Sequence, residues 1–118
     1  MRIRQIPRWF DEGVAVVVAG EPRHSEENWR QIQRRGVPTP ALAELISSSD
    51  WTAAVRKYGE TKGDDPDNLR PVYSTAGHEL RQWVACAGPL GAVALLTEVR
   101  EGGAFDVVYR RIGQACLQ

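Results

Sequence analysis

The sequence predicts a mainly α-helical fold, built as one small domain over residues 1–118. A chain of 118 residues and 13.1 kDa is close to the usual size of a single domain. The clearest helix signal is a set of apolar residues spaced so that they share one face of an α-helix. These residues are Tyr73, Ala76, Leu80, Trp83, Val84 and Ala87. A shorter stripe with the same spacing predicts a last helix, made by Phe105, Val108, Tyr109 and Ile112.

The segment 7–19 carries two opposing signals. Pro7 suits the start of a helix, and Asp11 and Glu12 are acidic residues of the kind that favour a first turn. The following run 14–18 is mostly valine and has no alternation, which by propensity alone indicates a buried strand. From local sequence both structures stay open.

Shorter helices are expected before the central loop. Ser25 can cap a surface helix that ends near Arg35, and a helical turn over 41–46 would point its apolar residues inward. Those residues are Leu42, Leu45 and Ile46. A further helix is expected at 51–58, after a serine-rich cap. Residues 59–68 are rich in Gly and Asp, so we expect a flexible acidic loop there.

The C-terminal part, about 72–113, should be helical throughout, with a break at Gly88 and Pro89. Val93, Leu95, Leu96 and Val99 should carry the apolar side of the helix that follows the break. Cys86 lies on the strongest helix and is expected to be a small buried residue rather than a nucleophile.

Charge and hydropathy argue against several classes of protein function. Lys and Arg number 15, as do Asp and Glu, so no net charge would draw the chain to nucleic acid. The longest apolar run has six residues, against about 20 needed to cross a bilayer, so neither a transmembrane segment nor a membrane partner is expected. The same run is too short for a signal peptide. The two cysteines have no metal-pair spacing.

One short motif carries functional information. Residues 7–15 read Pro-Arg-Trp-Phe-Asp-Glu-Gly-Val-Ala. A carboxylate at Glu12 is costly to bury unless it is paired or bound to metal, and Gly13 removes a side chain where either another backbone or the site must come close. Trp9 and Phe10 would anchor the segment in the core. An exposed Glu12 in an ordinary first turn is the alternative interpretation.

This segment resembles the Trp-x-x-Glu-Gly-x-Ala helix of gluzincin metallopeptidases, in the peptidase MA-like branch. The resemblance implies that 7–19 is a helix, that Glu12 is the third ligand of a catalytic zinc, and that the chain is similar to the C-terminal subdomain of such an enzyme. The order of Tyr73, Gly91, Leu95–Leu96 and Gly102 with Phe105 also looks similar to the family. The resemblance implies that Tyr73 stabilises the oxyanion of the intermediate, although Tyr73 also begins an apolar stripe.

The zinc-binding histidines of that family are missing. A gluzincin needs His-Glu-x-x-His, whereas His78 begins a similar run that ends in Gln82. His24 is expected to be an exposed, titrating side chain. Asp64, Asp65 and Asp67 read as a solvated loop rather than a calcium site.

We therefore expect a partial zinc peptidase-like domain without catalytic activity or cofactor of its own. Zinc and a peptide or protein substrate would belong to a longer form whose histidine motif lies upstream of Met1. The alternative is a stand-alone helical interaction protein, with a homodimer as a candidate assembly, since four tryptophans exceed what a small core obviously needs. The cellular compartment stays open.

Overall fold

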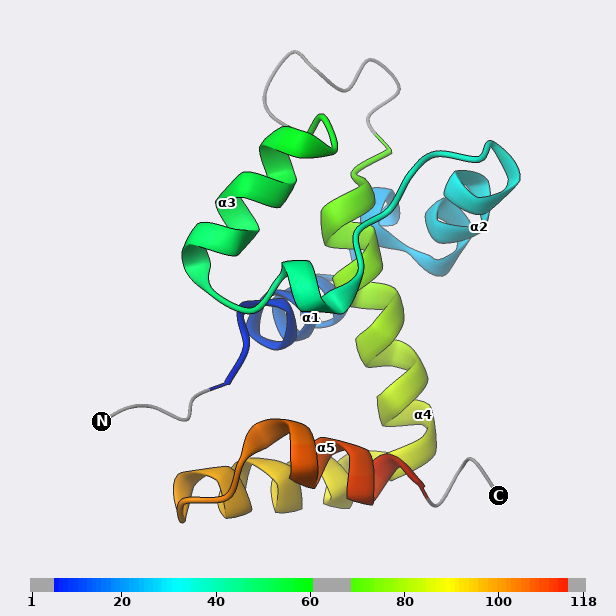
Figure 1. The fold of residues 1–118 in the computed structure, drawn as a ribbon. Helices are drawn as coiled ribbons and strands as arrows, with labels where there is room; N and C mark the ends of the chain where they lie inside the picture. Colours follow the sequence, from blue (N-terminus) through cyan, green and yellow to red (C-terminus); the bar gives the residue numbers. More distant parts are fainter. Residues whose placement is uncertain (1–5, 61–68, 115–118) are drawn as a thin grey trace. The chain divides into compact units, whose positions relative to one another are not determined.

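The computed structural model describes residues 6–60 and 69–114 (Figure 1). Every regular element in these ranges is helical, which confirms the mainly α-helical class. The elements are α1 (Arg8–Ala19), η1 (Pro22–His24), α2 (Glu26–Arg34), η2 (Leu42–Glu44), α3 (Ser48–Lys57), α4 (Pro71–Arg100) and α5 (Phe105–Gly113). The predicted acidic loop lies mostly outside the described residues.

The backbone divides into two compact units. One spans Pro7–Leu80, and the other combines residues 1–6 with 81–118. We call them the Pro7–Leu80 unit and the C-terminal unit. The expectation of a single domain over 1–118 stays a prediction, and each unit is described by itself.

The Pro7–Leu80 unit is built around the first turns of α4 (Figure 1). Its core consists of side chains that are at most 8% exposed. They are Trp9, Phe10, Val16, Ile32, Leu45, Trp51, Ala54, Leu69, Val72, Ala76 and Leu80. These residues come from α1, α2, α3, α4 and the connections between them, so each of these helices contributes one apolar face.

The ambiguous segment 7–19 forms a helix, α1. Gly20 caps its C-terminal end in a left-handed backbone conformation. The amide nitrogens of Arg8 and Trp9 donate to the carbonyl oxygens of Ile46 and Leu45, at 2.7 and 3.0 Å. These bonds satisfy backbone donors that every helix N-terminus leaves open. Tertiary packing of the Trp9 and Phe10 side chains outweighs the strand propensity of the valines.

Burial of the valine run was predicted wrongly. Val14, Val17 and Val18 are 39%, 38% and 80% exposed, because the helix turns its other face, with Gly13 and Val16, into the core. Ile46 was also expected inside but is 49% exposed, because Leu45, the residue that follows η2, takes the buried position instead.

The predicted serine caps of α2 and α3 are present. The Ser25 hydroxyl accepts from the Asn28 amide at 3.2 Å, and the Ser47 hydroxyl accepts from the Asp50 amide at 3.0 Å. The Asp50 carboxylate accepts in turn from the Ser47 amide, which closes a capping box. α3 therefore begins at Ser48, three residues before the predicted start.

α4 is broken at Gly88, as predicted. Gly88 has φ 75° and ψ 170°, a backbone conformation that only glycine adopts readily, and Pro89 follows it. By length and composition α4 is also apolar enough to cross a membrane. A single helix of this kind is weak evidence of a span, because core helices of soluble proteins meet the same criterion. The expected absence of a membrane segment stays a prediction.

In the C-terminal unit, α5 lies along the second part of α4 (Figure 1). The Trp83 ring stacks on Tyr109 at 4.8 Å, and its indole N–H donates to the Tyr109 carbonyl at 3.0 Å. Phe105 stacks on the same tyrosine at 5.2 Å. Trp83, Leu95, Phe105 and Val108 are the buried apolar side chains here.

Two expectations for this unit were wrong. Cys86 is exposed, because the buried face of α4 passes through Trp83 instead. Val93 and Leu96, expected on the apolar side with Leu95, are 61% and 47% exposed, and only Leu95 of these three turns into the core.

Candidate functional site

The Glu12 helix is held against α4 at a glycine. A Cβ atom placed on Gly13 would lie 2.8 Å from the Ala76 carbonyl oxygen and 3.3 Å from the Leu80 Cβ. Real Cβ atoms essentially never come that close to a backbone oxygen. The predicted role of Gly13, to permit a close backbone approach, is confirmed for its contact with α4.

Glu12 lies beside this crossing and is half-buried, with its side chain 20% exposed. Its Oε2 accepts from Arg8 twice, from Nε at 2.7 Å and from Nη2 at 2.6 Å. The Arg8 Nη1 donates to the Ser48 hydroxyl at 2.9 Å. The charge of Glu12 is therefore balanced within α1, by a guanidinium that also reaches the start of α3.

Asp11 adds a second carboxylate next to the Arg8–Glu12 ion pair. Burial raises the pKa of the Asp11 carboxyl above its ordinary value of 3.8 by more than the Arg8 guanidinium lowers it. The neighbouring Glu12 carboxylate adds to that rise. One arginine thus serves two adjacent acidic side chains.

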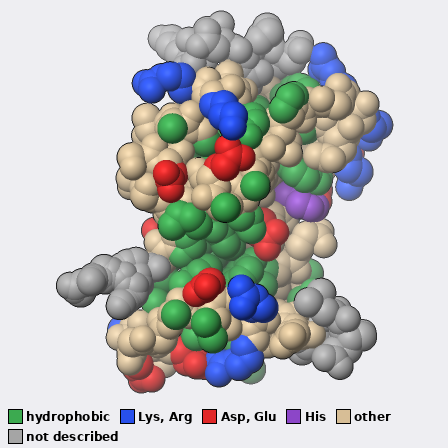
Figure 2. All heavy atoms as spheres, in the orientation of Figure 1, with side chains coloured by type: hydrophobic (Ala, Val, Ile, Leu, Met, Phe, Trp, Pro, Cys, Tyr) green, Lys and Arg blue, Asp and Glu red, His purple; other side chains and the backbone are tan. Residues whose placement is uncertain are grey.

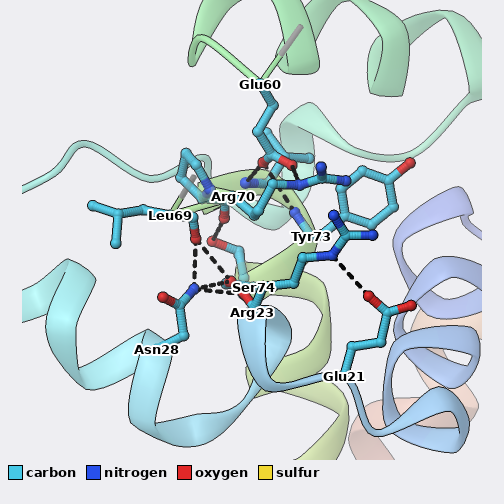
Figure 3. A network of polar contacts seen from close by, with 11 residues as sticks. Glu21, Arg23, Asn28, Glu60, Leu69, Arg70, Tyr73 and Ser74 are labelled. Atoms are coloured by element: carbon cyan, nitrogen blue, oxygen red, sulfur yellow. Dashed lines mark hydrogen bonds and ion pairs between the residues drawn. The ribbon is translucent and has the colours of Figure 1, made fainter. Parts of the chain in front are cut away.

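Tyr73 lies in the first turn of α4, where several rings and one cation surround it. It stacks on His24 at 5.3 Å and meets Trp51 edge-on at 5.1 Å. The Arg70 guanidinium carbon lies 4.9 Å from the centre of the Tyr73 ring. Figure 3 shows the Tyr73 hydroxyl turned away from the polar groups at the start of α4. Among the described residues, that hydroxyl has no hydrogen-bond partner.

The structure places Glu12 and Tyr73 on two helices that touch, but not in contact with each other. α1 meets α4 at Ala76, one turn after Tyr73. Within the described ranges, neither a hydrogen bond nor an ion pair joins the two side chains. Each has its own neighbours: Arg8 for Glu12, and the aromatic group with Arg70 for Tyr73.

Glu60 is a buried carboxylate that sequence reasoning assigned to the acidic loop. Its carboxylate is fully buried and accepts from the amides of Val72 and Tyr73, the latter at 3.2 Å. The Arg70 Nε donates to the other oxygen at 3.1 Å. Glu60 therefore caps α4 from outside the helix (Figure 3). No local spacing signals this role, because twelve residues separate Glu60 from Val72.

The strained backbone next to this cap is held by the same carboxylate. Arg70 has φ 57°, a left-handed conformation that side chains other than glycine rarely adopt. The ion pair with Glu60 and the position over the Tyr73 ring account for its retention.

Both histidines have structural neighbours. His24 was expected to be exposed, but it is only 7% exposed because its ring is covered by Tyr73. His78 stacks on Trp29 at 4.4 Å, and its Nδ1 lies 2.9 Å from both carboxylate oxygens of Glu26. These contacts link α4 to α2.

The zinc chemistry that the resemblance implies does not fit these residues alone. Across residues 6–60 and 69–114, no three His, Cys, Asp or Glu side chains gather as metal ligands would. A catalytic zinc needs three protein ligands, and Glu12 supplies at most one. Comparison with known proteins finds no matching family model, curated protein or solved structure.

Proposed function

We propose that this chain is the third-ligand part of a gluzincin-type zinc peptidase and that it has no peptidase activity by itself. The observation that carries the proposal is the contact between Gly13 and the Ala76 backbone. It gives the Glu-Gly pair of the motif a physical reason: the glycine lets two helices touch, and the adjacent glutamate is fixed beside the crossing.

The surroundings of Tyr73 support its proposed role as an oxyanion stabiliser. The ring is fixed on three sides by His24, Trp51 and Arg70, while the hydroxyl keeps its donor capacity. A donor preorganised in this way is what stabilisation of a developing negative charge requires. The role also requires that the other zinc ligands be supplied near α1 and α4.

The chain by itself lacks the His-Glu-x-x-His motif on which catalysis would depend. The two histidines and the general base of His-Glu-x-x-His must come from another polypeptide segment, since the chain has two histidines in total and both have structural neighbours. Zinc and a peptide or protein substrate belong to that completed form.

The first test is to sequence the genomic DNA upstream of the Met1 codon. An in-frame His-Glu-x-x-His about twenty or more codons before Glu12 is the expected result. A stop codon and ribosome-binding site directly upstream would contradict the proposal.

The second test uses the longer protein encoded there. It should bind zinc stoichiometrically and cleave peptides, and Glu12→Gln should lower its zinc affinity by about 10-fold or more. The matched control is Glu21→Gln, which removes an exposed carboxylate paired with Arg23 and should leave the zinc affinity unchanged. Equal zinc affinity in the Glu12 and Glu21 variants would reject Glu12 as a ligand.

A second candidate function is a helical interaction protein, with a homodimer as its candidate assembly. Large apolar side chains reach the surface of the molecule (Figure 2). The most exposed are Val18 in α1 and Leu90 in α4, at 80% and 83%. Surfaces that another molecule covers carry such side chains in contiguous patches, whereas single exposed apolar residues are normal on a monomer. Sedimentation equilibrium of the purified chain tests this candidate: a concentration-independent monomer would remove the support for a homodimer.

A further inference from the structure

We propose that Arg8 is the positioning residue of Glu12, anchored in turn by Ser48 of α3. The motif resemblance gives Arg8 no role. Arg8 acts on the Glu12 carboxylate, and the importance of this contact for zinc rests on the proposed function. The hydrogen bonds themselves can be tested without any metal.

The two oxygens of the Glu12 carboxylate have different surroundings. Both Arg8 donors, Nε and Nη2, reach the same oxygen of Glu12, Oε2. The other oxygen, Oε1, accepts no hydrogen bond from the described part of the chain. Carboxylates that bind metals are commonly hydrogen-bonded by neighbouring residues that fix their orientation. Arg8 holds one oxygen in this manner and leaves the other open.

Helix stability does not explain the position of Arg8. Arg8 is the first residue of α1, where a positive charge opposes the helix dipole. Its guanidinium also reaches Ser48, the first residue of α3, and so lies near a second positive helix end. Arginine four residues before glutamate is the less favourable order for a helical pair. The placement is instead accounted for by the fixed orientation of Glu12.

Arg8 is itself fixed at its backbone and at its guanidinium. Its amide nitrogen donates to the Ile46 carbonyl at 2.7 Å, and its Nη1 donates to the Ser48 hydroxyl at 2.9 Å. The backbone of Arg8 is thus tied to the segment preceding α3, and the tip of its side chain is tied to α3 itself. A long side chain held at both ends loses less entropy when it binds a carboxylate.

The test measures the reactivity of Glu12 in the purified chain. A water-soluble carbodiimide with glycine ethyl ester labels free carboxylates, and peptide mass spectrometry gives the labelling rate of Glu12 relative to exposed Asp106 of α5. Arg8→Ala should raise this ratio by about threefold or more, because the carboxylate is released from its two donors. Arg8→Lys should restore part of the protection, and Ser48→Ala should give an intermediate ratio.

Arg23→Ala provides the matched control. It removes an exposed arginine that pairs with Glu21 at 2.7 Å, so it should raise labelling of Glu21 and leave Glu12 unchanged. Circular dichroism checks that each variant is folded, and Ser48→Ala keeps the test informative if Arg8→Ala unfolds. An unchanged Glu12 ratio in folded Arg8→Ala overturns the proposal, as does an equal rise in Arg23→Ala. Neither result depends on whether the longer form binds zinc.

Discussion

At the scale of single residues, Gly13 sets the distance between two helices. The space where its side chain would lie is occupied by the carbonyl oxygen of Ala76 and the Cβ of Leu80. Neither atom belongs to the flexible end of a side chain, so a larger residue cannot be accommodated by rotation alone. The same position in the sequence neighbours Glu12, so an error in helix spacing would also move the carboxylate.

Gly13→Ala should therefore destabilise the chain by about 1 to 3 kcal/mol, despite the better helix propensity of alanine. Urea unfolding followed by circular dichroism measures the change. Val18→Ala, at an 80% exposed position of the same helix, serves as the control and should change stability by less than about 0.5 kcal/mol. A Gly13→Ala protein as stable as the control would mean that the helices do not approach as described.

Glu60 is the other residue whose removal should be costly. Its buried carboxylate accepts from two α4 amides and from Arg70, and glutamine would turn an N–H₂ group toward at least one of these donors. Glu60→Gln should lower the free energy of unfolding by about 2 to 3 kcal/mol in urea titration. Glu101→Gln, at an exposed position after α4, should have little effect. Similar losses in both variants would contradict the capping role.

At the scale of elements, η2 and α3 are joined by a carboxylate whose protonation should weaken the fold. Glu44 accepts from the Ala41 amide, from the Tyr58 hydroxyl at 2.9 Å and from Lys57 at 3.2 Å. These bonds, with that of the Ala41 amide the largest, hold the pKa of Glu44 below its ordinary value of 4.5. The pKa of Lys57 is raised by its hydrogen bond to the same carboxylate.

A carboxyl group with a depressed pKa in the folded state stabilises that state above its unfolded pKa. This stabilisation is lost as the pH falls from 4.5 through the lower folded value. Glu44→Gln should therefore lose less stability than wild type between about pH 6 and about pH 3, as measured by urea unfolding at each pH. Parallel losses in the two proteins would contradict the assignment.

Much of the helical pattern can be predicted from sequence because it depends on interactions between residues that are close in the sequence. The serine caps, the glycine break at Gly88 and the stripe through Ala76 and Leu80 each act within one or two turns. What could not be predicted depends on contacts between distant residues. Exposure of Val18, burial of His24 under Tyr73 and capping of α4 by Glu60 all follow from which surfaces meet.

The candidate site, too, was predicted from the sequence only in part. The motif singled out Glu12 and Gly13, and the need for glycine was found where α1 meets α4. The partner of Glu12 was missed, although Arg8 stands four residues earlier in the same motif. An i to i+4 pair of opposite charges is a signal that could have found it.

At the scale of the whole molecule, the two units differ in the number of apolar side chains that they bury. Most buried apolar side chains belong to the Pro7–Leu80 unit, whereas Trp83, Leu95, Phe105 and Val108 form the smaller core of the C-terminal unit. Local stability follows the density of buried contacts. We expect amide hydrogen exchange to be slowest in α1, α3 and the first turns of α4, and faster in α5. Equal protection in α5 and α1 would contradict this ranking.

The ion pair between Glu60 and Arg70 has a further consequence for engineering. It joins two side chains that stand ten positions apart in the sequence. Lengthening such a closed stretch adds an entropy penalty that grows only with the logarithm of its length. We therefore expect an affinity tag or a protease recognition sequence inserted ahead of buried Leu69 to leave the ion pair and the cap of α4 in place.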